Sequence, residues 1–201
     1  SCKELFLVQE NRIISENVPG HYNPSLTMKK YFKNVVNAEI KVFGESNIKV
    51  KNKNMHIFPL KSGDLNKCSV DTLSEYLKSD LYVVFGTSYI KGDLVDFLVK
   101  NKTINIHMGV SPYYRGADCN FWALYDDNPH LVGSTIHMLS KGLASGNILY
   151  HALSQIKNDP FEDTMSTVKS AFYSLNEKIK NKTIFDIKPI VQNKKIELRY
   201  S

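Results

Sequence analysis

The stretch Ile-Asn-Ile-His at 104–107 places an amide and an imidazole two residues apart. Side chains in a strand alternate between its two faces, so Asn105 and His107 project from the same side if this short run is a strand. The segment that follows, Ser-Pro-Tyr-Tyr-Arg-Gly at 111–116, has the composition of a loop. An amide can stabilise negative charge that develops on oxygen, and a histidine can exchange a proton near neutral pH. We therefore predict a site that polarises a carbonyl group and moves a proton.

Buried strands that alternate with helices are expected to hold this pair. The apolar run 81–85 ends in Gly-Thr and has the unbroken hydrophobicity of a strand that is buried on both faces. A short helix is expected over 92–101, and the next strand over 103–107. This alternation predicts an α/β fold with a Rossmann-like, mostly parallel sheet flanked by helices. Ligands of such sheets bind at the carboxyl ends of the strands, so residues 85–87 and 105–107 should lie at one edge.

The other elements are predicted from hydrophobic periodicity and from turn residues. Strands are expected over 3–9, 55–60, 132–139 and 147–155, and helices over 25–42, 69–77, 118–127 and 163–179. Ser69 is the expected N-cap of its helix. We also expect a turn over 19–23, a charged connection over 49–53 and a β-hairpin over 190–200 that turns at Asn193. Residues 1–182 should form one domain, and residues 183–201 a C-terminal extension.

Composition limits the classes of protein to which the chain can belong. With 42% hydrophobic and 23% charged residues in 201, it has the balance of an ordinary globular domain. Cys2, Cys68 and Cys119 form no disulfide framework, which favours a reducing cytoplasm, and no run reaches the ~18 apolar residues of a membrane span. The formal charge of +6 is scattered. It fits attraction to an anionic small substrate, or plain solubility, better than a nucleic-acid surface.

Five ordered sequence blocks resemble the signature of the folate-dependent formyltransferases. They are Asn-Ile-His at 105–107, Ser-Pro-Tyr-Tyr-Arg-Gly at 111–116, Trp-Ala-Leu at 122–124, Gly-x-Thr-Ile-His at 133–137, and Gly-Leu-x-x-Gly-x-Ile-Leu at 142–149. The family includes methionyl-tRNA formyltransferase, glycinamide ribonucleotide formyltransferase and the sugar N-formyltransferases. The resemblance is close over about residues 80–155 and implies a Rossmann-like catalytic domain that uses N10-formyltetrahydrofolate as co-substrate.

The resemblance also implies roles for individual residues, with one departure. By position, Asn105 would stabilise the oxyanion and His107 would assist proton movement. The family places a catalytic Asp in a Gly-Leu-Asp-x-Gly loop, where this chain has Ala144. An alanine cannot orient His107 or raise its pKa. The chain is therefore either a deliberately inactivated variant or a natural relative that has lost or rerouted catalysis. Asp118 could replace the carboxylate, although its place at the start of a helix favours a capping role.

Binding residues follow from the resemblance in the same way. Recognition of the pterin falls on the segment after the strand 81–85 and on a loop opposite, and substrate contacts fall on the 111–116 loop. The residues implied for the folate are Thr87, Ser88, Tyr89, Ile90, Leu139 and Gly142, and those implied for the substrate are Tyr114 and Arg115. Arg115 could equally anchor the loop. Lys91 stands where the family usually has a proline.

Family layout favours one class of acceptor. The chain ends soon after its last predicted helix, which leaves no room for the C-terminal β-barrel of the tRNA enzyme, so tRNA is disfavoured. A nucleotide-linked amino sugar is the favoured substrate, because a modest basic excess suits its phosphates. The strand at residues 5–8 matches one that family members reach only after a first βα unit, which is therefore expected to be absent. A homodimer is left open.

Other interpretations remain. A non-catalytic folate- or nucleotide-binding homologue is supported by Ala144, whereas a Rossmann oxidoreductase is disfavoured because no GxGxxG follows a first strand. His137 and Trp122 are expected to be structural. No spacing among His107, Cys119, His130 and His137 resembles a standard metal site, so no metal is predicted.

Overall fold

The computed structural model describes residues 3–11, 25–45, 53–157 and 159–200. The turn predicted over 19–23, most of the charged connection over 49–53, and Cys2 lie outside these ranges. Among the helices in these ranges, none combines the length and the apolar character that a membrane span requires.

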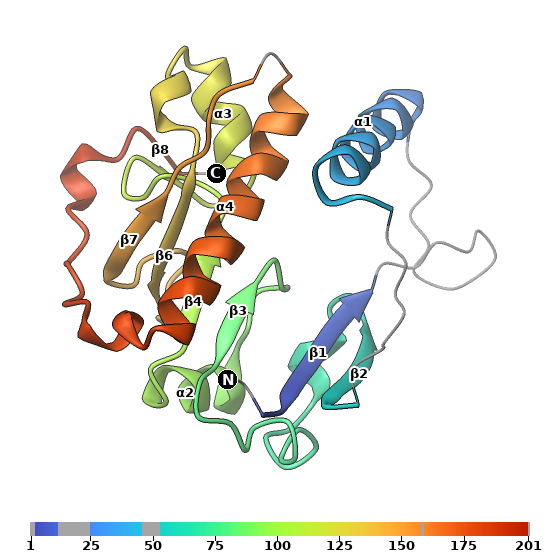
Figure 1. Ribbon diagram of the computed structural model, residues 1–201, viewed down its shortest axis with the longest axis vertical. Helices are drawn as coiled ribbons and strands as arrows, with labels where there is room; N and C mark the ends of the chain where they lie inside the picture. Colours follow the sequence, from blue (N-terminus) through green and yellow to red (C-terminus); the bar gives the residue numbers. More distant parts are fainter. Residues whose placement is uncertain (1–2, 12–24, 46–52, 158, 201) are drawn as a thin grey trace.

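The central sheet has four strands in the order β3 (Val83–Phe85), β4 (Ile104–His107), β6 (Ser134–Met138) and β7 (Ile148–Ala152). β3 and β4 run parallel, joined through the helix α2 (Gly92–Lys100), and the two remaining strand pairs are antiparallel. The long helix α4 (Pro160–Lys180) crosses one face of this sheet (Figure 1). The predicted α/β fold, with parallel strands flanked by helices, is confirmed, and the sheet becomes mixed on the side of β6 and β7.

Two further strand pairs flank the central sheet. β1 (Leu5–Asn11) and β2 (Met55–Lys61) pair in parallel, and the helix α1 (Leu26–Phe43) lies between them in sequence (Figure 1). β5 (Tyr114–Arg115) pairs in parallel with β8 (Arg199–Tyr200) beside the helix α3 (Cys119–Tyr125). Short 3-10 helices complete the described chain: η1 (Asp64–Lys67), η2 (Pro129–Leu131), η3 (Thr183–Asp186) and η4 (Lys194–Ile196).

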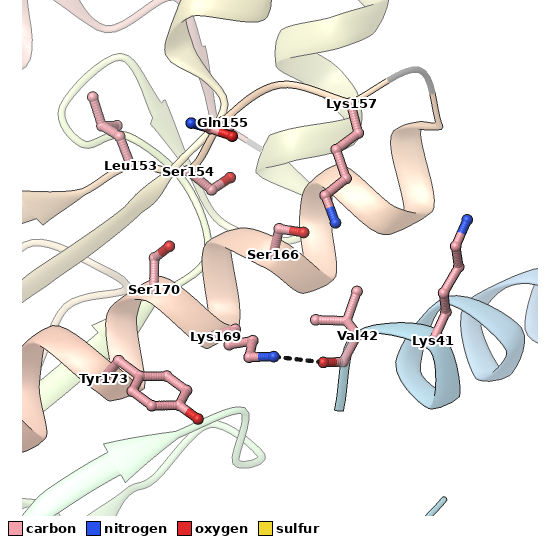
Figure 2. A pocket seen from close by; sticks show the side chains of 10 residues that line it. All are labelled: Lys41, Val42, Leu153, Ser154, Gln155, Lys157, Ser166, Lys169, Ser170 and Tyr173. Carbon is pink, nitrogen blue, oxygen red and sulfur yellow. Dashed lines mark hydrogen bonds between the residues drawn. The ribbon is translucent and has the colours of Figure 1, made fainter. Parts of the chain in front are cut away.

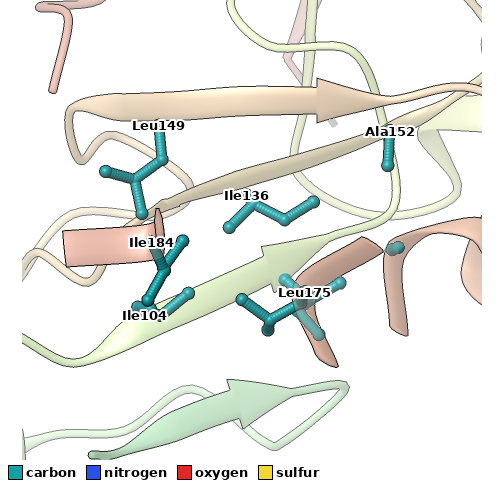
Figure 3. Close-up of a cluster of buried hydrophobic side chains, with 8 residues drawn as sticks. Ile104, Ile136, Leu149, Ala152, Leu175 and Ile184 are labelled. Atoms are coloured by element: carbon teal, nitrogen blue, oxygen red, sulfur yellow. The ribbon is translucent and has the colours of Figure 1, made fainter. Parts of the chain in front are cut away.

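The main core fills the space between the central sheet and α4. It joins Ile104, Ile136, Leu149 and Ala152 of the strands to Leu175 and Ile184 (Figure 3). Alternation along 81–85 explains why that run carries no polar residue. Leu81 and Phe85 contact this core, while Tyr82 and Val84 contact a second core around α2. The expected burial on both faces is therefore found, except that Val83 remains 43% exposed on a strand that has only one partner among the described residues.

Side-chain caps fix the beginnings of the helices α4 and α1. α4 begins three residues earlier than predicted, because the Asp159 carboxylate accepts hydrogen bonds from Phe161 N and Glu162 N, and Pro160 occupies the first helical position. α1 begins where predicted, with Ser25 Oγ accepting a hydrogen bond from Met28 N.

Two predicted elements are wrong. Residues 70–77 form successive turns instead of a helix, because the amides of Ser74 and Tyr76 bond three residues back while Leu73 and Leu77 bond four back. Residues 190–200 form no hairpin. Ile190 bridges to Ile148 and Arg199 pairs with Tyr114, so this segment satisfies its backbone against other strands instead of against itself.

Candidate functional site

Asn105 and His137 face each other across the antiparallel pair β4–β6 and form a hydrogen bond of 3.0 Å between Asn105 Nδ2 and His137 Nε2. The partners of the imidazole assign its tautomer. His137 Nδ1 lies 2.8 Å from the carbonyl oxygen of Met138, which can only accept, so Nδ1 carries the proton and Nε2 accepts from the amide. Burial lowers the pKa of His137, which keeps the ring neutral. The Asn105 amide is therefore held in one orientation with a second N–H left over.

His107 lies two residues further along β4, as the alternation of the strand predicts. Its Nε2 lies 3.2 Å from the carbonyl oxygen of Tyr114 and so carries the ring proton, which leaves Nδ1 unprotonated. Burial lowers the pKa of His107 to about 4, and the positive charge of Arg115 acts in the same direction. The imidazole is therefore neutral at neutral pH.

Cys119 lies beside the same ring nitrogen of His107, with its Sγ 3.6 Å from Nε2. Burial raises the pKa of Cys119 to about 12, so it is a thiol and not a nucleophile. Gly109 leaves room for this contact. A Cβ at position 109 would stand 2.8 Å from His107 Nε2 and 2.5 Å from Cys119 Cβ, so any side chain there would displace both groups.

Two long side chains donate hydrogen bonds to backbone carbonyls of the loop that carries Ala144. Arg115 donates to the carbonyl of Leu143 at 2.9 Å, and Gln192 donates to the carbonyls of Ala144 at 3.0 Å and Gly146 at 2.6 Å. Gly146 cannot be replaced without moving this loop, because a Cβ there would lie 1.6 Å from the oxygen of Met138. The loop is therefore a rigid frame around position 144.

Ala144 itself has an unusual backbone conformation, with φ at +43°. The left-handed region costs most L-residues about 1–2 kcal/mol, and Asn and Asp enter it more readily because their short side chains can hydrogen-bond locally. The side chain of Ala144 is buried, with 8% of the residue exposed. The frame thus has the backbone geometry that suits an acidic residue, while the residue present has no functional group.

A second loop, which follows β3, lies across from the Ala144 loop. Glu10, at the end of β1, accepts hydrogen bonds from Ser88 N and Oγ and from the amides of Gly63 and Leu65. Burial raises the pKa of Glu10, but these hydrogen bonds more than offset that, so its pKa lies below the ordinary value. Tyr89 spans the two loops by donating from its hydroxyl to the carbonyl of Lys141 at 2.5 Å.

These elements enclose a cavity of about 250 Å³, which we call the Asn105 pocket. It collects Asn105, His107 and Ala144 together with every residue implied for the folate, namely Thr87, Ser88, Tyr89, Ile90, Leu139 and Gly142. Apolar side chains of Val84, Val95 and Ile106 complete its wall. The pocket therefore combines an apolar slot with a few fixed polar groups, the usual composition of a small-molecule site.

Tyr114 and Arg115, the residues implied for the substrate, do not line this pocket. Tyr114 is 1% exposed, with its hydroxyl bonded to Asp126 and Asn128. Arg115 is 6% exposed and pairs with Glu197 at 2.6 Å. Both side chains are bound within the protein, which matches the anchoring role that was left open for Arg115 and assigns the same kind of role to Tyr114.

Two pocket residues differ from the role that the sequence favoured for them. His137 was expected to be structural, yet it lies directly opposite Asn105, and the partial alternation of the strand 132–139 was the available signal. Asp118 stands at the expected N-cap position of α3, but its φ is +50° and its side chain makes no capping hydrogen bond. It lines the pocket instead and is the only carboxylate to do so within the described chain.

Most of the chain matches a known protein family. A family model described as formyl transferase matches residues 27–184, more than three quarters of the chain. The chain belongs to this family. The resemblance drawn from the five sequence blocks is confirmed, and so is the expectation of a formyl-transfer enzyme at the level of the family.

Solved structures of formyltransferases share the fold. The formyltransferase PseJ from Anoxybacillus kamchatkensis, solved with UDP-4,6-dideoxy-4-formamido-L-AltNAc and tetrahydrofolate, superimposes with a TM-score of 0.52 at 21% identity, over 95% of this chain and 82% of its own. A 4-N formyltransferase from Francisella tularensis gives 0.54 at 17% identity, over 95% and 73%. A phosphoribosylglycinamide formyltransferase from Anaplasma phagocytophilum gives 0.53 at 18%, over 79% and 87%. At these identities the likeness concerns the fold alone.

Proposed function

We propose that the Asn105 pocket binds N10-formyltetrahydrofolate and that the chain transfers its formyl group to the primary amine of a nucleotide-linked amino sugar. The observation that carries the proposal is the hydrogen-bonded pair of Asn105 and His137, set between the loops 86–90 and 139–144. Membership of the formyl transferase family supports the group transferred. The Anoxybacillus relative, which holds tetrahydrofolate and a UDP-linked formamido sugar, supports the folate and the class of acceptor.

The pocket fits the reacting end of a folate. Its apolar wall suits a flat heteroaromatic ring, and residues 86–90 line the pocket along one side, with the Ser88 amide bonded to Glu10 and the Tyr89 carbonyl bonded to Asn66. With a volume of about 250 Å³, the pocket can take the ring and the formyl group while the remainder of the molecule extends outside. No resident metal or prosthetic group is needed for this chemistry.

Formyl transfer requires the chain to stabilise negative charge on the formyl oxygen and to move protons. The amine nitrogen forms a bond to the formyl carbon, the bond from that carbon to N10 of the folate breaks, one proton leaves the amine and one reaches N10. The free N–H of Asn105 would donate to the formyl oxygen as negative charge builds there, an effect of about 3 kcal/mol for a single well-placed donor. Asp118, the carboxylate of the pocket, would take the amine proton, and neutral His107 would pass a proton onward.

A non-catalytic folate-binding homologue is the second candidate. The observation that favours it is Ala144, together with the low pKa of His107, about 4. A histidine that stays neutral and has no carboxylate beside it is a weak proton shuttle. The cytoplasmic location remains a prediction, methionyl-tRNA remains the disfavoured acceptor, and the homodimer remains open.

A paired substitution separates the two candidates. Ala144→Asp should raise formylation of a UDP- or dTDP-linked 4-amino sugar by about 100-fold, the scale of general acid–base catalysis. Ala144→Asn is the matched control, because it relieves the same left-handed backbone but supplies no base. Formylated product would be measured by mass spectrometry with N10-formyltetrahydrofolate as donor. If the folate binds and Ala144→Asp never forms product with any amino sugar of the panel, the binding homologue is correct.

The native chain provides a second test through Asp118. If catalysis has been rerouted, the unmodified protein should turn over, and Asp118→Asn should lower its rate by about 100-fold while leaving folate affinity unchanged. Asp127→Asn, an exposed residue outside the pocket, serves as the control. A full rate in Asp118→Asn would remove Asp118 from the mechanism, and absence of folate binding to the unmodified protein would overturn the whole proposal.

A further inference from the structure

A second and larger cavity lies between α1 and α4, away from the Asn105 pocket, with which it shares no lining residue. Its volume is about 720 Å³. We call it the lysine pocket, and Figure 2 shows its ten lining residues: Lys41, Val42, Leu153, Ser154, Gln155, Lys157, Ser166, Lys169, Ser170 and Tyr173. Three ammonium groups and no carboxylate line it within the described chain. Two carboxylates lie next to the lining: Glu162 pairs with Lys41, and Asp163 accepts a hydrogen bond from the backbone amide of Lys157. The charged groups that line the cavity itself are all basic.

Contacts between the two helices hold this cavity in place. Lys41 of α1 forms an ion pair with Glu162 of α4, and Lys169 Nζ donates to the carbonyl of Val42 at 2.8 Å. An ammonium group has three hydrogens, so each of these lysines keeps donors for a ligand. Lys157 appears in no ion pair among the described residues, although its charge acts on the nearby Asp163 carboxylate and opposes the rise that burial causes in the pKa of that group. Its ammonium therefore keeps its donors for an anion.

Ser166 gives an independent indication of a ligand. The residue is 9% exposed, and its hydroxyl has no hydrogen-bond partner among the described residues. Figure 2 shows this hydroxyl on the pocket side of α4, directed toward the space that the Lys157 ammonium also enters. Buried hydroxyl groups are nearly always paired, so an unpaired one on a cavity wall is suited to donate to a bound oxygen.

The remaining lining residues indicate what kind of anion would fit. Ser154, Ser170 and Gln155 add polar donors, and a phosphate group offers oxygen acceptors for several donors at once. The volume far exceeds the space that one phosphate occupies. Tyr173, which is 63% exposed, offers an aromatic face, and Leu153, 58% exposed, offers an apolar one to an organic body that carries the phosphate.

We propose that the lysine pocket binds the diphosphate group of a phosphorylated organic molecule, with Lys157 and Ser166 as its principal contacts. Two sources share this chemistry: the nucleotide part of the acceptor, or a separate phosphorylated effector. The first source, in which the diphosphate belongs to the acceptor of formyl transfer, rests on the function proposed above; the second does not. Binding of diphosphate does not depend on formyl transfer, so each proposal can fail without the other.

The test measures binding of inorganic pyrophosphate and of UDP to the whole chain by isothermal titration calorimetry. Both should bind the unmodified protein. Lys157→Gln should weaken pyrophosphate binding at least tenfold, and Ser166→Ala at least threefold without loss of thermal stability, since it removes an unpaired buried hydroxyl. Lys100→Gln, which removes one exposed charge from α2 outside both pockets, should leave affinity unchanged. Absence of binding, or equal weakening by Lys157→Gln and Lys100→Gln, would overturn the proposal.

Protection from acetylation provides a measurement that needs no variant. Pyrophosphate should slow acetylation of Lys157 and Lys169, read by mass spectrometry, and leave Lys100 unaffected; equal rates with and without pyrophosphate would contradict the site. The source of the diphosphate group is identified by measuring formylation kinetics of an active form of the enzyme in the presence of UDP. If UDP inhibits competitively against the amino-sugar substrate, and this inhibition disappears in Lys157→Gln, the pocket belongs to the acceptor. UDP that binds but leaves the KM of the acceptor unchanged assigns it to a separate effector.

Discussion

The Asn105 pocket and the lysine pocket differ in how they hold their polar groups. In the first, two neutral imidazoles and one amide are fixed by backbone carbonyls and by one another, in a cavity of about 250 Å³. In the second, three ammonium groups on long side chains surround about 720 Å³. A reacting centre requires orientation, because a developing charge must meet a donor that is already in position. A site that captures an anion can rely on charge, which acts at longer range and tolerates mobile side chains.

The strongest test of this contrast removes the oriented donor. Asn105→Ala, made in whichever background is active, should lower kcat by about 100- to 1000-fold, because the formyl oxygen loses its donor and His137 loses its partner. Steady-state formylation assays would measure the loss. Lys157→Gln is the comparison: if its effect on kcat equals that of Asn105→Ala, the two pockets do not divide the work as described.

Burial of His107 predicts a pH dependence of stability. Its pKa is about 4 in the folded chain and 6.5 in the unfolded one, so between these values the unfolded state binds more protons. Its contribution is fully present above about pH 6.5 and falls by about 3 kcal/mol as the pH drops to about 4. Urea unfolding between pH 4 and pH 7.5 would measure it, with His107→Gln as the reference that lacks the titration. A slope identical in both proteins would show that His107 is not desolvated.

The frame behind Ala144 should be sensitive to the loss of one side chain. Gln192→Ala removes two hydrogen bonds to loop carbonyls and should lower the free energy of unfolding by about 2 kcal/mol, at about 1 kcal/mol for each bond. Gln155→Ala, the same truncation at the exposed wall of the lysine pocket, should cost less than about 0.5 kcal/mol. Chemical denaturation compares the two, and equal costs would mean that the loop is not held by Gln192.

The smallest expected effect is that of salt on binding affinity, which should differ between the two pockets. Raising NaCl from about 50 to about 500 mM shortens the screening length roughly threefold and should weaken pyrophosphate binding at the lysine pocket by about tenfold. Folate binding, followed by fluorescence in the same buffers, should change less than about threefold because neutral groups dominate the Asn105 pocket. A salt response as steep for the folate would place charge at the centre of its recognition.

The local pattern of the chain predicted a large share of this arrangement. Alternation along 104–107 predicted that Asn105 and His107 share a face, and apolar runs between turn residues predicted β3, β4 and the helix between them. Ordered blocks of residues predicted the family, which the family model confirms, whereas the loss of a catalytic carboxylate at position 144 stays a prediction. The failures came where the backbone found distant partners. Residues 190–200 pair with Tyr114 and Ile148, which no local rule could anticipate.

The sequence alone determined which functional groups are available, because the types and spacing of Asn105, His107 and Ala144 are properties of the chain itself. Tertiary structure decided what those groups can do. His137 becomes the partner of the Asn105 amide only through the register of β4 and β6, and Asp118, whose backbone is left-handed, joins the pocket only in the folded chain. Register, burial and pKa depend on contacts between segments far apart in sequence, so they arise only when the chain has folded.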